Sequence, residues 1–199
     1  MSLRVHRIPF STNVERVALA CAHKGVVVEW VEHEAEDRSA IRALSGQDLV
    51  PVAETRDGVI GDSAAILAWL DRAHPEPPLW PHDPSRRAEA DVFVEWFNRV
   101  WKRAANALVE REDPRAEAEL AGWLERFEAL LGDRPFLLGD ELGIADIVAF
   151  PFLKYPVLGL APDDTHPFHA VLVRTMSGRA ESSSRVREWV ARVDAYPRA

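Results

Sequence analysis

Cysteine is almost absent from this sequence, because Cys21 is the only one among 199 residues. A single thiol excludes an internal disulfide and a Cys-x-x-Cys redox pair. Basic residues form no run and the formal net charge is -8, so we expect no nucleic acid partner, since phosphate binding depends on clustered Lys and Arg. No apolar stretch reaches the length of a membrane span, and the N-terminus lacks the apolar core of a signal peptide. We therefore expect a cytoplasmic protein with no membrane partner.

Histidine spacing gives little sign of a metal site. Seven histidines occur, and the pair His166-x-x-His169 does not define a site by itself. We therefore predict no metal. Hydrophobic residues make up 47% and charged residues 28% of the chain, which is usual for a globular protein long enough to bury a core.

The first 78 residues alternate short β-branched segments with amphipathic helical segments. Their order predicts a mixed sheet, because a strand–helix–strand crossover pairs its strands in parallel and the Asp57-Gly58 turn adds an antiparallel hairpin. Strands are expected at 4–8, 26–31, 52–55 and 59–60, and helices at 14–24, 38–44 and 63–72. We interpret residues 1–78 as one α/β domain.

Proline is concentrated between the two halves of the chain. Five of the eleven residues 74–84 are proline, a composition that forms neither helix nor central strand, and we take residues 79–84 as the linker. Beyond it the apolar spacing is helical, which predicts an all-α domain over residues 85–199. Helices are expected at 85–111, 116–131, 143–158, 171–176 and 185–193.

Two short motifs in the first half point to peptide binding. Val50-Pro51 joins a helix to a strand, and a cis bond at this junction would turn the backbone groups of Val50 outward, since cis bonds are close to exclusive to proline. Asp62 and Ser63 open an apolar helix, whose unpaired N–H groups and positive dipole end favour a carboxylate. A strand edge beside such a helix start is suited to hold a short acidic peptide.

Three motifs in this order resemble the cytosolic glutathione transferases, over nearly the whole chain. The motifs are Pro9-Phe10-Ser11-Thr12-Asn13-Val14-Glu15-Arg16-Val17, the pair Val50-Pro51 and Asp62-Ser63, and Pro135-Phe136-Leu137-Leu138-Gly139-Asp140-Glu141-Leu142-Gly143-Ile144-Ala145-Asp146. The resemblance implies a thioredoxin-like α/β domain followed by an all-helical one, a homodimer, and glutathione as co-substrate. Within the third motif, Asp146 at the third position of a helix capped by Gly143 fits a capping box, which we interpret as structural.

The resemblance also implies roles for individual residues. Ser11 stands where serine-type, bacterial members of the family stabilise the glutathione thiolate. Val50, which Pro51 exposes, is expected to pair with the cysteinyl backbone as an added strand. Ser63 is expected to hold the γ-glutamyl carboxylate and Asp62 the ammonium.

Two parts of the ligand are harder to assign. For the glycyl carboxylate we choose Gln47, with Arg38 and Arg42 as alternatives, because Leu49 occupies the place where many relatives carry Lys or Gln. The electrophile is expected against a wall formed by a few aromatic and basic side chains. The candidates for this wall are Phe10, Trp96, Arg99 and Arg103.

A hydroxyl at a helix start matches what thiol chemistry needs. A thiol with a pKa of about 8.5 is mostly protonated at neutral pH, whereas the thiolate is the nucleophile. A hydroxyl donor and the positive end of a helix dipole both stabilise that anion. Ser11 is our choice of donor and Thr12 the second choice; the alternative is that Ser11, Thr12 or Asn13 only caps the helix.

The predicted function is direct attack of the thiolate on a small hydrophobic electrophile, without a covalent enzyme intermediate. Two alternatives stay open: a non-catalytic binding or regulatory module that keeps the fold, and a glutathione-dependent isomerase or dehalogenase. The chain has 21 arginines and 3 lysines, a usage common in GC-rich bacteria, some of which make a different thiol. Glutathione is therefore an expectation from the resemblance.

Overall fold

A mixed sheet of four strands organises the first half of the chain in the computed structural model, which describes residues 3–199. The strands are β1 (Leu3–Arg7), β2 (Val28–Glu32), β3 (Val52–Thr55) and β4 (Gly58–Gly61), in the order β2-β1-β3-β4. β1 and β2 are parallel, with Val5 opposite Trp30, and the other neighbours are antiparallel. This confirms the predicted mixed sheet, and β2 begins at Val28, two residues later than expected.

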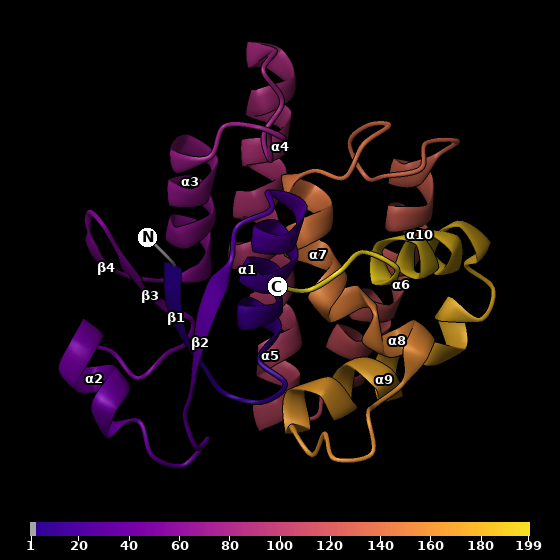
Figure 1. The fold of residues 1–199 in the computed structure, drawn as a ribbon. Helices are drawn as coiled ribbons and strands as arrows, with labels where there is room; N and C mark the ends of the chain where they lie inside the picture. The colour runs from indigo at the N-terminus through magenta and orange to yellow at the C-terminus, as the bar shows by residue number, and fades with distance from the viewer. Residues whose placement is uncertain (1–2) are drawn as a thin grey trace. The chain divides into compact units, whose positions relative to one another are not determined.

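Three helices accompany this sheet: α1 (Thr12–His23), α2 (Ser39–Ser45) and α3 (Ser63–Ala73). α1 packs against α3, and α2 contacts β4 (Figure 1). The apolar face of α2 contributes Ile41 to a buried cluster with Val14, Val50 and Val52. This cluster ties the start of α1 to the segment that leads into β3.

The chain divides into two compact units, and the boundary lies between Leu79 and Trp80. Unit 1 contains the sheet and also Tyr196–Ala199, which we had expected in the helical domain. Specific contacts explain this difference, because the Trp30 indole N–H donates to the Ala199 carbonyl at 2.8 Å and Arg198 pairs with Glu15 at 3.2 Å. Unit 2 is Trp80–Ala195 and is helical.

A buried lysine joins the ends of α1 and α3 within unit 1. The side chain of Lys24 is fully buried, and its ammonium pairs with the Asp71 carboxylate at 3.0 Å. The same ammonium donates to the carbonyls of His74 and Pro77 at 2.6 and 2.7 Å. All three of its N–H donors therefore have acceptors, and this satisfies the main condition for burying a charge.

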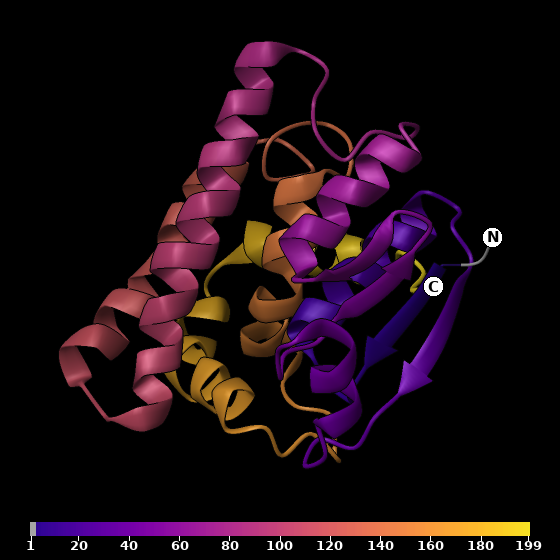
Figure 2. The same cartoon turned by 90° about the vertical axis from the view of Figure 1, so that its left-hand side faces the viewer.

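Unit 2 consists of helices in the part of the chain that the structure describes. These are α4 (Pro84–Trp96), η1 (Phe97–Trp101), α5 (Lys102–Glu110), α6 (Pro114–Leu131), α7 (Ile144–Leu153), α8 (Tyr155–Leu158), α9 (Pro167–Ala180) and α10 (Ser184–Asp194). The single helix expected at 85–111 contains one π-helical turn, η1, and runs on through α4 and α5 as one long rod (magenta to salmon in Figure 2). No helix in residues 3–199 has the length and apolar character that a membrane crossing needs.

The helix α7 is buried at every position and depends on its cap. The Asp146 carboxylate accepts hydrogen bonds from the Gly143 and Leu137 backbone N–H groups at 3.1 and 2.9 Å, and from the Trp189 indole at 2.7 Å. Burial raises the pKa of Asp146 to about 6, although these donors oppose the shift. The residue thus joins α7, the preceding loop and α10, which supports its interpretation as structural.

Candidate active site

Ser11 lies between the end of β1 and the first turn of α1. It is the N-cap of α1, and its half-buried Oγ accepts from the Val14 backbone N–H at a long distance of 3.4 Å. A hydroxyl that accepts this bond still has its own hydrogen to donate. Capping and donation to a ligand sulfur are therefore compatible roles, and the two interpretations of Ser11 do not exclude each other. Thr12, the second choice of donor, is only 8% exposed.

The residues on either side of the Ser11 turn differ in exposure. Phe10 is 42% exposed and has a backbone φ of 56°, in the left-handed region that non-glycine residues seldom adopt. Strained backbone of this kind tends to occur at functional sites. Phe10 therefore presents an aromatic ring to solvent directly before the candidate hydroxyl.

The Val50-Pro51 segment lies next to the start of α3. Its peptide bond is cis, and the Pro51 carbonyl accepts from the Asp62 backbone N–H at 3.5 Å. β3 starts at the next residue, Val52, which pairs with Gly61 of β4. The structure thus brings together two motifs that are separated by ten residues in the sequence.

Asp62 and Ser63 begin α3. The Asp62 carboxylate caps the helix by accepting from the Ala64 and Ala65 backbone N–H groups at 2.8 and 3.2 Å. Asp62 has φ 113°, which costs about 1–3 kcal/mol for a residue with a side chain. Ser63 is 5% exposed. The side chains therefore differ in setting: the Asp62 carboxylate is at the surface and the Ser63 hydroxyl lies behind it.

Gln47 approaches this helix start from the other side. Its side-chain amide packs on the backbone of Gly61, where a Cβ atom would come within 2.1 Å of the amide nitrogen. A side chain at position 61 would require the Gln47 amide to move. The two alternatives to Gln47 have other partners, since Arg42 pairs with Asp48 at 2.7 Å and Arg38 donates to the Ala35 carbonyl at 2.6 Å.

Arg16 is a residue of this site that the sequence analysis did not single out. It is 1% exposed, and its Nη1 donates to the Ser63 Oγ at 3.4 Å. Burial lowers the pKa of Arg16 to about 9, while the charge of Asp62 acts in the opposite direction. The guanidinium therefore stays positively charged at neutral pH. The available signal was an arginine placed between Val14 and the apolar stretch 17–21.

The remaining candidates, Trp96, Arg99 and Arg103, belong to unit 2. Trp96 is half-buried and packs on Trp123, with ring centroids 4.6 Å apart, and it also contacts Phe93 and Phe127. Arg99 pairs with Glu95 on the same helix at 2.6 Å, and Arg103 is exposed. Trp96 is thus part of an aromatic cluster of unit 2, whereas the two arginines are at its surface.

Other reactive groups play no part in this arrangement. Cys21 is fully buried, and burial raises the pKa of its thiol to about 12, so it is not a nucleophile at neutral pH. Within residues 3–199, no group of three or more His, Cys, Asp or Glu side chains is arranged to hold a metal ion.

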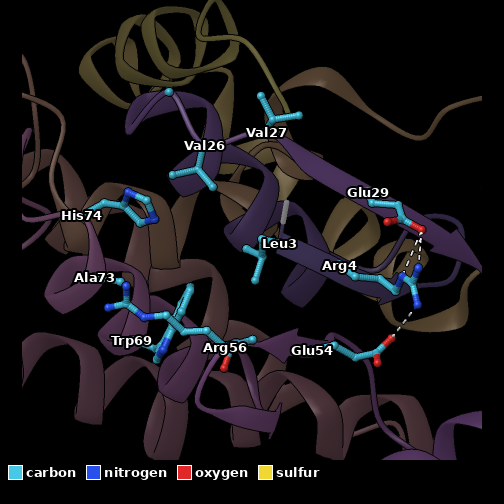
Figure 3. Close-up of a pocket in the computed structure, with 12 residues that line it drawn as sticks. Leu3, Arg4, Val26, Val27, Glu29, Glu54, Arg56, Trp69, Ala73 and His74 are labelled. Carbon is cyan, nitrogen blue, oxygen red and sulfur yellow. Dashed lines mark hydrogen bonds and ion pairs between the residues drawn. The ribbon is translucent and has the colours of Figure 1, made fainter. Parts of the chain in front are cut away.

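A depression of about 840 Å³ lies elsewhere in unit 1 (Figure 3). It is lined by the start of β1 and the end of α3, including Leu3 and Trp69, and at its edge Arg4 bridges Glu29 and Glu54 at 2.9 and 3.5 Å. None of the predicted site residues lines it. The candidate site is therefore at the opposite end of β1, where the chain enters α1.

Two family models match this chain in succession. Residues 5–78 match the model of the glutathione S-transferase N-terminal domain, and residues 102–177 match that of the glutathione S-transferase C-terminal domain. A probable glutathione S-transferase of Solanum tuberosum is 31% identical over 147 residues, which are 71% of this chain and 65% of that protein. The chain therefore spans slightly less than two thirds of this plant relative.

Two further relatives match the chain over most of its length. A stringent starvation protein A homolog of Coxiella burnetii is 26% identical over 196 residues, which cover 90% of this chain and 92% of that protein. The crystal structure of a glutathione S-transferase from Rhodospirillum rubrum F11 has a TM-score of 0.77 at 27% identity, and the match covers 98% of this chain and 89% of that one.

Proposed function

Because the chain belongs to the glutathione transferase family, we propose that it stabilises the thiolate of glutathione for attack on a small hydrophobic electrophile. The observation that carries this proposal is the presence of three peptide-binding features in unit 1, where a buried cluster of Val14, Val50 and Val52 connects the start of α1 to the segment before β3. The Ser11 hydroxyl caps α1, and the Val50-Pro51 segment contacts Asp62, which begins α3. Each feature serves a different part of a short peptide thiol.

Glutathione binds through its backbone and its charged ends. The Val50 backbone pairs with the cysteinyl residue in the manner of an added strand. The γ-glutamyl carboxylate accepts from the hydroxyl and the backbone N–H of Ser63 at the start of α3, where the helix dipole favours an anion. The Asp62 carboxylate pairs with the ammonium, and the Gln47 amide donates to the glycyl carboxylate.

The chemical step needs a sulfur anion. The Ser11 hydroxyl donates to the sulfur, and the start of α1 adds a positive dipole end. Each unit by which the thiol pKa falls corresponds to about 1.4 kcal/mol of stabilisation of the thiolate. With an aryl halide, the sulfur lone pair forms the new carbon–sulfur bond, the halide leaves with the bonding electrons, and the thiol proton passes to water. Phe10, Trp96, Arg99 and Arg103 stay candidates for contact with the electrophile.

A second candidate function is a binding or regulatory module. The observation that favours it is the match to a stringent starvation protein A homolog over 92% of that protein, since this relative is not named as a transferase. We also propose a cytoplasmic location and a homodimer; analytical ultracentrifugation of the purified chain tests the dimer directly. Dimerisation does not discriminate between the two functions.

The decisive experiment combines calorimetry with a turnover assay. Glutathione, free cysteine and a sugar-linked cysteine thiol are titrated into the purified chain, and turnover is followed with glutathione and chlorodinitrobenzene. We expect glutathione to bind and the conjugate to form. Binding without turnover supports the regulatory module, and no measurable affinity for glutathione overturns the choice of thiol.

A further inference from the structure

The guanidinium of Arg16 lies behind the start of α3, in the interior of unit 1. It is 1% exposed, and it donates through Nη1 to the Oγ of Ser63, which is itself 5% exposed. Burying a charge is unfavourable unless polar groups surround it, and an apolar side chain of similar volume is often as stable or more so. A buried cation at this place therefore calls for a reason beyond stability.

The donor and acceptor roles at Ser63 supply one reason. A serine hydroxyl can donate one hydrogen bond and accept two, whereas a guanidinium only donates. Because the Ser63 Oγ accepts from Arg16, its own hydrogen is directed to another acceptor. Ser63 is thus fixed as a donor, which is the role that a ligand carboxylate requires.

The charges around the helix start supply a second reason. Asp62 places a carboxylate at the N-cap of α3, and Arg16 lies close enough for the two charges to interact. With Asp62 alone, the site would repel an anion. With both residues present, it offers one negative and one positive charge, which match the ammonium and the carboxylate of a free amino-acid end.

We propose that Arg16 is a positioning residue that fixes the Ser63 hydroxyl as a donor and balances the Asp62 charge, so that this end of the site selects a zwitterionic α-amino-acid group. The inference rests on the proposed binding of glutathione, whose γ-linkage leaves both the α-amino and the α-carboxylate group free. Arg16 acts through Ser63 and the local field and does not itself take part in the chemical step.

The test compares two peptides that differ only in the α-carboxylate. Glutathione and γ-aminobutyryl-cysteinyl-glycine are titrated by calorimetry into the wild-type chain and into Arg16→Met, which is similar in length and uncharged. We expect Arg16→Met to weaken glutathione binding by roughly 10-fold to 100-fold, the range for a hydrogen bond to a charged group. The Kd of the peptide without the carboxylate should stay the same or fall, because the loss of a positive charge does not weaken the contact between its ammonium and Asp62.

Two further variants keep the test decisive. Arg16→Lys retains the charge and is expected to keep most of the preference for glutathione, and Arg16→Gln replaces Arg16→Met if the latter does not fold. In a Ser63→Ala background the effect of Arg16→Met should shrink, because the hydroxyl through which it acts is gone. Circular dichroism and thermal melts of every variant monitor folding.

The outcomes separate this inference from the proposed function. If the wild-type chain binds neither peptide, the proposed function fails. If the wild-type chain binds glutathione but Arg16→Met weakens the binding of both peptides equally, Arg16 has only a structural role and the inference is overturned. An unchanged Kd for glutathione in the folded Arg16 variants overturns it as well.

Discussion

Replacing Ser11 by alanine removes a helix cap and the proposed thiolate donor at the same time, and the two losses differ in size. The cap bond to Val14 is long, at 3.4 Å, so its loss belongs at the low end of measured cap energies, about 0.5 kcal/mol of stability. A hydrogen bond to an anion contributes about 1.5–3 kcal/mol. Because Ser11 is half-buried, water replaces part of this bond, and we expect about 1.5 kcal/mol, which is roughly one unit in the thiol pKa.

The assay is the pH dependence of turnover and of bound-thiolate absorbance. At pH values below the thiol pKa, Ser11→Ala should lower kcat/KM roughly tenfold, and the deficit should close as the pH rises above it. Ser11→Thr keeps the hydroxyl and should retain most of the activity. Asp113→Ala, which removes the cap of α6 in unit 2, should lose stability with an unchanged pH profile.

One result would refute the reasoning about Ser11. If Ser11→Ala loses about as much stability as predicted while its pH profile and thiolate absorbance match the wild-type chain, then the hydroxyl only caps α1. The thiolate would then have another donor, and Thr12→Val should show the pH shift instead.

Three other predictions concern charged side chains. Asp62→Asn keeps a capping side chain and should lower thermal stability only slightly, through the lost attraction to Arg16, while weakening glutathione binding about tenfold; an unaltered calorimetric Kd would contradict the ammonium contact. Lys24→Met leaves the carboxylate of Asp71 without its ion pair, so urea unfolding should show a loss of about 3–5 kcal/mol, against less than about 1 kcal/mol for the exposed control Arg42→Ala. Since burial raises the pKa of Asp146 to about 6 from 3.8, the native state holds this proton more tightly than the unfolded state. Its contribution to the unfolding free energy therefore falls as pH rises through that interval. Asp146→Asn should remove that decrease, and identical pH curves for the two proteins would disprove the assignment.

Much of the fold follows from local patterns in the sequence. The order of strands and helices in unit 1 can be predicted from β-branched runs and from the glycine and Asp-Gly signals of helix ends and turns. The structure confirms this order. The Val50-Pro51 and Asp62-Ser63 motifs are equally local, because a proline before a strand and a polar cap before an apolar helix can each be recognised without knowing their surroundings. These signals were sufficient to choose the segments of the candidate site.

The features that the sequence did not predict depend on contacts between distant segments. The sequence near Arg16 does not indicate that this side chain contacts Ser63, because the two residues are 47 positions apart and meet only when α1 packs against α3. The return of Tyr196–Ala199 to unit 1 depends on Trp30, far earlier in the chain. The π-helical turn η1 contains no proline or glycine that would indicate a change in the helix. For Arg16 and the C-terminal segment, the residue types are ordinary and only the tertiary partner is specific.

The two charged links between α1 and α3 have a common geometry. Arg16 meets Ser63 and Lys24 meets Asp71, so the links are eight residues apart on each helix and join residues 47 apart in both cases. At 1.5 Å per residue they lie about 12 Å apart along parallel helices. Two links at equal spacing prevent the helices from sliding past each other. The starts of these helices carry Ser11 and Asp62, and a misplacement of about 1 Å can cost a hundredfold in rate. The Lys24 link is therefore expected to support the site from a distance, and Lys24→Met should weaken glutathione binding even at temperatures where the chain remains folded.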